Sequence, residues 1–311
     1  MKAVIHIGTP KSGSTTIQAF LALNRDALER QGFRQAPMQP NTIAQMELGL
    51  AGLVRAGGRL TVPNRLHALG LRAGDDQEAL VARFEAMLRE AVRHAPDDTY
   101  IASAEQVHAW LSTADKVAAL DYLLRGHFEQ VRYVVYYRPQ AEFMLSTFSE
   151  RIKRGERVTF EQHFAERLHR MDFHRRAQMW ASVVGHRNLS VRLVDGGVMV
   201  NGNLLDDFCA VAGIQRAGLQ TPPRMNVSLT VEEIALYRRL GRVLAARRAH
   251  GGPNPVFRAA LALAHRALPS PGTRLALTPA QRAQVIAANA DSNERLRAQF
   301  FPDRTTLFST P

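Results

Sequence analysis

A loop near the N-terminus combines glycines, a lysine and several hydroxyl side chains. It runs Gly8-Thr9-Pro10-Lys11-Ser12-Gly13-Ser14-Thr15-Thr16. The apolar run 3–7 before it indicates a strand, and apolar residues at helical spacing follow it. A loop between a strand and a helix N-terminus can hold a phosphate with its backbone N–H groups. We therefore predict an anion-binding loop in which Ser12, Ser14, Thr15 and Thr16 add hydroxyl donors.

The position of the lysine separates this loop from the P-loop of nucleoside triphosphatases. Gly8 and Gly13 have the P-loop spacing, but in a P-loop the lysine follows the second glycine and a Ser or Thr ligates magnesium. Here Ser14 follows Gly13, and Lys11 stands two residues before it. Lys11 is thus not placed to reach a γ-phosphate as a P-loop lysine does, and from this position it can lie against the bridging oxygen of a ligand such as a 5′-phosphosulfate. No carboxylate cluster has metal-ligand spacing, and we expect no metal.

An arginine and a serine form a second candidate pair of anion ligands. Arg138 ends the β-rich run 131–137, and Ser146 follows eight residues later in a predicted helix. The planar guanidinium of arginine can give a phosphate two parallel charged hydrogen bonds. Alone, Arg138 is equally explained as a surface ion pair and Ser146 as a solvated helix serine.

Together these residues resemble sulfotransferases that depend on 3′-phosphoadenosine 5′-phosphosulfate (PAPS), in particular the bacterial ones with a P-loop-like fold. The stretch 9–15 is similar to their 5′-phosphosulfate loop, and Arg138 with Ser146 matches their 3′-phosphate site. The resemblance implies PAPS as co-substrate and Lys11 as the catalytic cation. It implies these cofactor-binding residues: Lys11, Ser12, Gly13, Ser14, Thr15, Thr16, Arg138 and Ser146. Weaker similarity covers most of the chain except residues 35–75 and 250–277.

Two features depart from the family pattern. Thr16 stands where cytosolic members have an aromatic residue that stacks on adenine, and their Arg-Lys-Gly stretch has no clear counterpart. Arg224 is a candidate for the missing third phosphate ligand, and a surface charge is the competing interpretation.

Glu105 is the predicted general base. Bacterial relatives often have Ser-Ser-Glu after a middle strand, and Ile101-Ala102-Ser103-Ala104-Glu105 is similar. A structural role competes, because Ser103 and Gln106 have capping-box spacing and would place Glu105 in a first helical turn, complementing the helix dipole. That place lowers a carboxyl pKa unless burial raises it. His108, with an ordinary pKa of about 6.5, is the alternative base.

The elements that must position these side chains alternate between strand and helix. Strands are predicted at 3–7, 99–103, 131–137 and 189–194, and helices at 77–94, 105–111, 115–124, 139–155 and 204–212. Thr230 and Thr278 begin helices in the last third, and 35–75 should hold loops and short helices. This pattern predicts an α/β fold, with a parallel β-sheet flanked by helices and a helical C-terminal layer. We expect one domain spanning 1–311.

The expected activity is transfer of a sulfuryl group from PAPS to a hydroxyl or amine. The expected acceptor is a carbohydrate, a glycolipid or a small metabolite. Two alternatives remain open. A P-loop phosphotransferase would need a lysine after Gly13 and a Walker-B aspartate. A non-catalytic nucleotide- or nucleic-acid-binding protein would need neither Lys11 chemistry nor a base.

The charge of the chain limits the classes of partner that we expect it to bind. The net charge is +12, but the 40 Lys and Arg residues are spread along the chain, which argues against a nucleic-acid partner. An anionic cofactor or acceptor, or simply a solvated basic surface, explains the charge equally well.

A cytoplasmic location is expected from three observations. The single cysteine, Cys209, excludes an internal disulfide and a cysteine-based zinc site. The apolar stretch 3–5 is too short for a signal peptide. The run 256–268 is too short and too charged for a transmembrane segment, and predicts an amphipathic helix packed on the protein. Peripheral contact with a membrane stays open for that helix.

Overall fold

Five parallel strands form the sheet of this protein, seen here in a computed structural model that describes residues 1–36, 38, 43–223, 228–246, 252, 254–266 and 272–309. The strand order is β2-β3-β1-β4-β5. The strands are β1 (Lys2–Ile7), β2 (Phe33–Arg34), β3 (Thr99–Ala104), β4 (Gln130–Tyr137) and β5 (Leu189–Leu193). The predicted fold class, a parallel sheet flanked by helices, is confirmed.

The central strand β1 marks the point where the chain changes sides. After β1 the chain adds β2 and β3 on one side, and then β4 and β5 on the other. Ile7 pairs with Ala104 of β3 and with Val135 of β4, so the three strands end close together. In open parallel sheets the crevice at such a switch point, beyond the carboxyl ends of the strands, is where ligands bind.

Alternating side chains on the strands fill two cores, one on each face of the sheet. In β1, Ala3, Ile5 and Ile7 enter the larger core, whereas Val4 enters the smaller one. In β4 the larger core takes the residues at odd positions from 131 to 137. Burial on both faces explains why these strands are almost continuously apolar.

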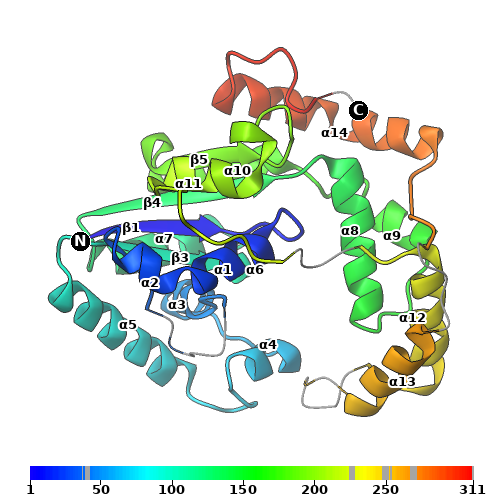
Figure 1. Cartoon of the computed structure of the whole chain (residues 1–311), viewed down its shortest axis with the longest axis horizontal. Coiled ribbons are helices and arrows are strands. Elements are labelled where there is room, and N and C mark those ends of the chain that lie inside the picture. Colours follow the sequence, from blue (N-terminus) through cyan, green and yellow to red (C-terminus); the bar gives the residue numbers. More distant parts are fainter. Residues whose placement is uncertain are drawn as a thin grey trace.

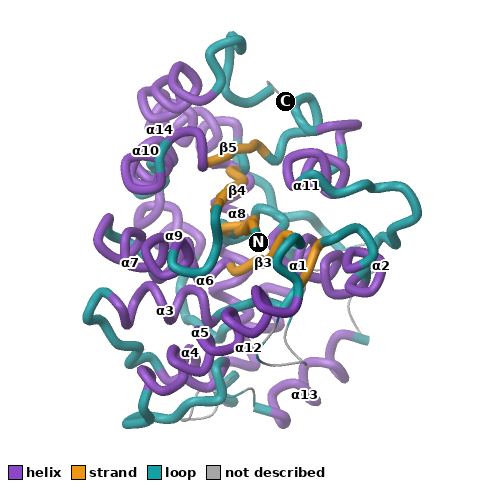
Figure 2. The backbone as a smooth tube through the Cα atoms, turned by 90° about the vertical axis from the view of Figure 1, so that its left-hand side faces the viewer, coloured by secondary structure: helices purple, strands orange, loops and turns teal. Residues whose placement is uncertain are grey.

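Helices cover both faces (Figure 2). The smaller core is closed by α1 (Ser14–Leu23), α2 (Arg25–Glu29) and α11 (Leu204–Ala212). The larger core is closed by α3 (Glu47–Arg55), α5 (Gln77–His94), α6 (Glu105–Trp110), α7 (Ala114–Arg125), α10 (Phe173–Val184) and α14 (Pro279–Phe300). The short helix α4 (Pro63–Ala68) adds Leu66 to the same core. Two 3₁₀ helices, η1 (His186–Asn188) and η2 (Val200–Gly202), flank β5.

A further group of helices stands beyond the carboxyl edge of the sheet, on the right of Figure 1. It contains α8 (Gln140–Lys153), α9 (Phe160–Arg167), α12 (Val231–Val243) and α13 (Pro255–His265). Its own small core includes Phe148 and Ile152 of α8 and Ile234 of α12. Because α8 begins directly after β4, one face of α8 is held opposite the ends of the central strands.

The sequence patterns located most elements. The helix at 77–94 has the predicted bounds, and Thr230 and Thr278 each form a capping box. Most other predicted bounds differ from the observed ones by one or two residues, and one predicted cap was wrong. Ser103 and Gln106 form no capping box, because Ala104 is the N-cap residue of α6 and the Ser103 hydroxyl lies 2.7 Å from Nδ1 of His6. The predicted helix 139–155 begins at residue 140 and ends at residue 153.

Candidate functional site

The loop between β1 and α1 has the backbone shape of an anion-binding nest. Lys11 has φ 64° and Gly13 has φ 85°, both in the left-handed region. In the part of the chain that the structure describes, the backbone N–H groups of Lys11, Gly13, Ser14 and Thr15 have no hydrogen-bond partner. Successive unpaired N–H groups at a helix N-terminus are the donors that bind a phosphate.

Hydrogen bonds made by hydroxyl groups hold this loop in its conformation. The Thr9 hydroxyl donates to the carbonyl of Tyr136, at the end of β4, and lies 2.6 Å from Oγ of Ser12. The Ser14 hydroxyl donates to the carbonyl of Thr9 at 3.0 Å. Ser12 is buried and is not among the residues that line the cavity. Ser14 lines the cavity, but its hydroxyl donates its hydrogen bond within the loop. The hydroxyl of Ser12 therefore shapes the loop.

A close contact with α11 requires glycine at position 13. A Cβ atom on Gly13 would lie 2.1 Å from Cδ2 of Leu204, the first residue of α11. The positive φ of Gly13 independently disfavours any other residue. The end of the loop is thus held against a helix from the second half of the chain.

Lys11 points away from the loop toward α8. Its Nζ lies 2.7 Å from Oε2 of Glu150, and Oε1 of Glu150 accepts from Nε of Arg154 at 3.2 Å. Burial, the largest single influence, raises the pKa of the Glu150 carboxyl, but the hydrogen bond and charge of Lys11 and the charges of Arg154 and Lys153 together lower it below its ordinary value. Glu150 is therefore an anion that holds the predicted catalytic lysine.

A cavity of about 580 Å³ opens at the carboxyl edge of the sheet and brings most of the predicted residues together. Its lining includes Lys11, Gly13, Ser14, Thr15, Thr16, Glu105, Arg138 and Ser146. Further lining residues are Pro10, Met46, Asn64, Arg65, Ala68, Gln106, Ala109, Trp110, Phe143, Thr147, Glu150, Arg151, Arg154, Arg167 and Ser228.

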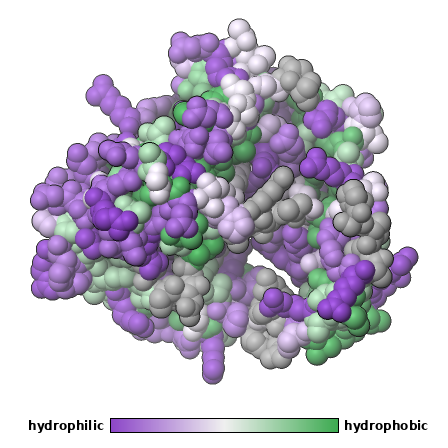
Figure 3. All heavy atoms as spheres, in the orientation of Figure 1, coloured by the Kyte–Doolittle hydropathy of each residue, from purple (hydrophilic) through white to green (hydrophobic). Residues whose placement is uncertain are grey.

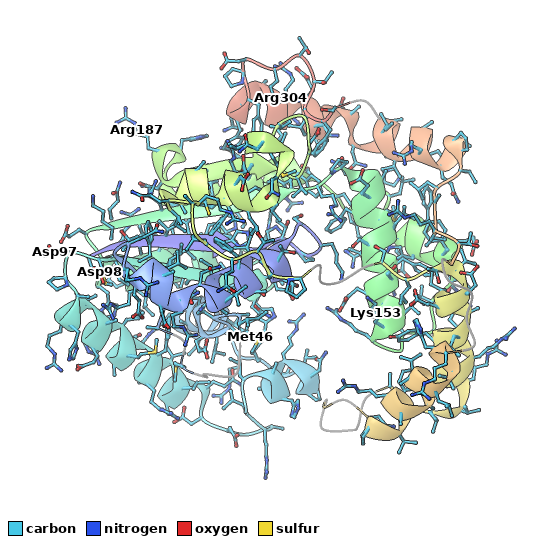
Figure 4. All side chains as sticks on the ribbon, viewed as in Figure 1. Met46, Asp97, Asp98, Lys153, Arg187 and Arg304 are labelled. Atoms are coloured by element: carbon cyan, nitrogen blue, oxygen red, sulfur yellow. The ribbon has the colours of Figure 1, made fainter. Side chains whose placement is uncertain are left out.

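The lining of the cavity is rich in cationic side chains. On the face shown in Figure 3, the surface is hollowed between the part that contains the sheet and the helices α8, α12 and α13. Met46 and Lys153, labelled in Figure 4, lie on opposite sides of that space. Five arginines line the cavity: Arg65, Arg138, Arg151, Arg154 and Arg167. Its lining is thus suited to negatively charged ligands.

Arg138 and Ser146 lie at the β4 side of this cavity. Arg138 directly follows β4, and Ser146 projects from the second turn of α8. Within the described residues, Nε of Arg138 is buried and has no hydrogen-bond partner. Burial lowers the pKa of the Arg138 guanidinium from its ordinary value, and the nearby charge of Glu142 opposes this shift. A buried guanidinium that makes no hydrogen bond or ion pair with a described carboxylate favours an anionic ligand.

Glu105 is the first residue of α6 and lies at the end of β3. Burial raises the pKa of its carboxyl, the neighbouring charge of Glu150 raises it further, and Lys11 and Arg154 oppose the shift. The raised pKa brings Glu105 closer to the range in which a carboxylate can accept a proton at neutral pH. The pKa of Glu105 is thus shifted upward by burial, opposite to the lowering expected from a place in the first helical turn.

The alternative base, His108, is not among the residues that line the cavity. Its backbone carbonyl accepts from Arg176, and its ring packs edge-on against Tyr137. Burial, with a contribution from Arg176, lowers the pKa of His108 to about 3. Its ring is therefore neutral at pH 7 and lies in the contact between α6 and α10.

Several cavity residues were not predicted from the sequence. Glu150 was recognised only as part of a stretch similar to relatives, although Ser146, Thr147, Glu150, Arg151 and Arg154 form a stripe at helical spacing on α8. That spacing was the available signal. No sequence pattern identified Asn64, Arg65 or Gln106 as cavity residues. Arg224 lies outside the described residues.

The described residues contain no group of three or more His, Cys, Asp or Glu side chains placed to hold a metal ion. None of the helices in that part of the chain has both the length and the apolar character needed to cross a membrane.

Comparison with known proteins gives a likeness in structure but none in sequence. No model of a known protein family matches this sequence, and no curated protein matches it. Among solved structures, the chain is similar to a sulfotransferase from Alicyclobacillus acidocaldarius, with 12% sequence identity over 96% of each chain and a TM-score of 0.49.

Proposed function

We propose that this protein is a PAPS-dependent sulfotransferase. One observation carries the proposal: the loop whose lysine precedes its second glycine shares a cavity with Arg138 and Ser146. The loop alone would suit many phosphorylated ligands. An arginine with an unpaired buried Nε in the same cavity supplies a second anion site, as a nucleotide with separate 5′ and 3′ anionic groups requires.

The chain's own groups divide between the two ends of such a donor. The free N–H groups of Gly13, Ser14 and Thr15, with the hydroxyls of Thr15 and Thr16, would hold the 5′-phosphosulfate. Arg138 and Ser146 would hold the 3′-phosphate. Both sets lie at the carboxyl edge beside β1, where the switch point of the sheet favours ligand binding.

The transfer step needs one cation and one base. An acceptor oxygen or nitrogen forms a bond to sulfur while the bond from sulfur to the bridging phosphate oxygen breaks, releasing 3′,5′-ADP. Lys11 stabilises the negative charge that develops on the bridging oxygen. Glu105 takes the proton that the acceptor loses. The acceptor belongs to the carbohydrates, glycolipids or small metabolites.

Calorimetry with nucleotides tests this proposal. We expect 3′,5′-ADP to bind without magnesium and ATP to bind poorly, because ATP lacks the 3′-phosphate that Arg138 and Ser146 would contact. Tighter, magnesium-dependent binding of ATP would favour a phosphotransferase. Binding of 3′,5′-ADP with no release of 3′,5′-ADP from PAPS, across a panel of hydroxyl and amine acceptors, would favour a non-catalytic binding protein.

A further inference from the structure

One wall of the cavity contains none of the residues that we assign to holding the donor. It is formed by α4 and α6 and lies on the same side of the cavity as Glu105. Four cavity-lining residues of α6 share one stripe of that helix: Glu105, Gln106, Ala109 and Trp110. The short helix α4 adds Asn64, Arg65 and Ala68. We call these seven residues the α4–α6 wall.

The α6 half of this wall is held rigidly from behind. Gly49 of α3 lies so close to α6 that a Cβ atom at this position would be 3.0 Å from the Gln106 backbone and from Cε3 of Trp110. Trp110 is 7% exposed and belongs to the larger core. Gln106 and Trp110 therefore have little freedom, and a ligand meets a preformed surface.

Two amide oxygens in the α4–α6 wall are left unsatisfied. Oδ1 of Asn64 and Oε1 of Gln106 are buried, and neither has a hydrogen-bond partner in the described part of the chain. Buried polar atoms in folded proteins are almost always paired, so an unpaired atom in a cavity wall requires an explanation. Amide oxygens accept hydrogen bonds, and a ligand that satisfies both must bring at least two O–H or N–H donors.

A free cation stands beside these oxygens. The guanidinium of Arg65 lies over the ring of Trp110, with Cζ 5.9 Å from the ring centroid. It has neither an ion pair nor a side-chain hydrogen bond with any described residue. The ring holds the guanidinium in one place and leaves its N–H groups available. Arg65 is thus placed to bind a negatively charged group on the same ligand.

We propose that the α4–α6 wall is the acceptor subsite and that it takes an acidic saccharide, a polyhydroxylated sugar that carries a carboxylate. This inference rests on the proposed sulfotransferase function. Sugar hydroxyls donate to Asn64 and Gln106, and the carboxylate pairs with the fork of Arg65. Because Glu105 belongs to the same wall, a hydroxyl of the bound sugar lies on the side of the base.

A matched pair of saccharides tests the assignment. The probes are a disaccharide that contains glucuronic acid and its carboxyl-reduced, neutral counterpart, titrated by NMR into the protein saturated with 3′,5′-ADP. We expect the acidic disaccharide to bind roughly tenfold more tightly, which corresponds to one charged hydrogen-bonded pair. Arg65→Ala should abolish this preference. Gln106→Ala should weaken both sugars by a similar factor.

The controls separate this subsite from the proposed function. Arg72→Ala removes the same charge from an exposed position that does not line the cavity, and should keep the preference. Circular dichroism checks the fold of each variant. Equal affinity for the two disaccharides in the wild-type protein, or a preference that survives Arg65→Ala, would overturn the inference. So would a sugar phosphate that binds more tightly than the uronate.

The affinity for 3′,5′-ADP is measured first and separately. If the nucleotide binds and the saccharides do not, only the subsite fails. If the nucleotide does not bind, the proposed function fails, and a preference of the nucleotide-free protein for the acidic disaccharide still supports a saccharide site at this wall.

Discussion

Lys11 of the anion-binding loop and Glu150 of α8 form an ion pair, with 2.7 Å between Nζ and Oε2. Both side chains are largely buried, at 18% and 32% exposure. Glu150 lies one turn beyond Ser146 on the same helix. A phosphosulfate on the loop would therefore compete with Glu150 for the lysine. The ion pair holds the ammonium group of Lys11 next to the loop, where the proposed reaction requires a cation.

Lys11→Ala should reduce kcat far more than it reduces donor affinity. The lysine meets a charge that develops mainly in the transition state, and removal of one such contact typically lowers kcat on the order of 10²–10³-fold. Steady-state kinetics with PAPS and calorimetry with 3′,5′-ADP measure the two effects. Lys116→Ala, on α7 and outside the cavity, is the control. Normal turnover by Lys11→Ala would remove Lys11 from the mechanism.

The dependence of kcat/KM on pH should report the ionisation of the Glu105 carboxyl. A base works only when deprotonated, so kcat/KM should rise with pH through the pKa of Glu105, which burial, and then Glu150, hold above 4.5. Glu150→Gln removes a negative neighbour and frees the charge of Lys11. Both changes favour the anion of Glu105, and the acidic limb should move to lower pH.

Glu105→Gln should abolish that limb together with most of the activity, while circular dichroism shows an intact fold. The matched variant His108→Asn should keep both, because His108 lies outside the cavity. A folded, active Glu105→Gln protein, or a selective loss in His108→Asn, would assign the base differently.

Arg138→Ala should weaken nucleotide binding rather than turnover at saturation. Loss of hydrogen bonds from a charged group costs about 1.5–3 kcal/mol, or roughly 10- to 100-fold in affinity for 3′,5′-ADP. Affinity for 5′-AMP, which has no 3′-phosphate, should change little. An equal loss for both nucleotides would place Arg138 elsewhere on the donor. Arg132→Ala, on β4 but outside the cavity lining, controls for the loss of charge.

Site residues whose position follows from the local backbone could be predicted from the sequence. Contacts with residues distant in the sequence could not. The loop and Arg138 directly follow predicted strands, so their meeting at one edge of a parallel sheet could be foreseen. The partner of Lys11 could not, because Glu150 reaches it from another element, 139 residues away. Arg65 and Asn64 were unpredictable because α4 lies in a segment without a clear pattern.

The same contrast holds for the fold. Long periodic elements such as 77–94 were located by their apolar spacing. The two-residue strand β2 is too short to produce any period. The capping box at Ser103 failed because the hydroxyl pairs with the buried ring of His6 on β1, a tertiary contact that local spacing cannot show.

Asp207→Asn should destabilise the protein by about 3 kcal/mol, since it breaks a buried charged pair. The Asp207 side chain is fully buried and accepts from Arg192 Nε at 3.0 Å, from the Tyr136 hydroxyl at 2.7 Å and from the Val200 N–H at 3.1 Å. Chemical denaturation at pH 7 measures the change. Asp206→Asn, one residue away and partly exposed, should cost less than about 1 kcal/mol.

The Asp207 network also predicts acid sensitivity. Burial, the largest single influence, raises the pKa of Asp207, but the hydrogen bonds from Arg192, Tyr136 and the Val200 N–H, together with the charge of Arg192, lower it below its ordinary value. A carboxyl whose pKa is depressed by folding adds stability above its unfolded pKa of about 3.9, and this stability is lost as the pH falls. The stability difference between wild type and Asp207→Asn should therefore shrink below about pH 4. A constant difference down to pH 2 would contradict this account.

The contact between Gly13 and Leu204 has a consequence for the order in which the molecule is assembled. The loop 8–16 leaves the ribosome before the residues that support it, because Thr9 is hydrogen-bonded to a residue 127 positions later and Gly13 packs against Leu204. A nascent chain in which α11 has not yet been synthesised contains the loop without its contact to Leu204. The proposed nucleotide could thus bind this loop only after α11 has been synthesised, and its binding would report that the two halves of the chain have come together.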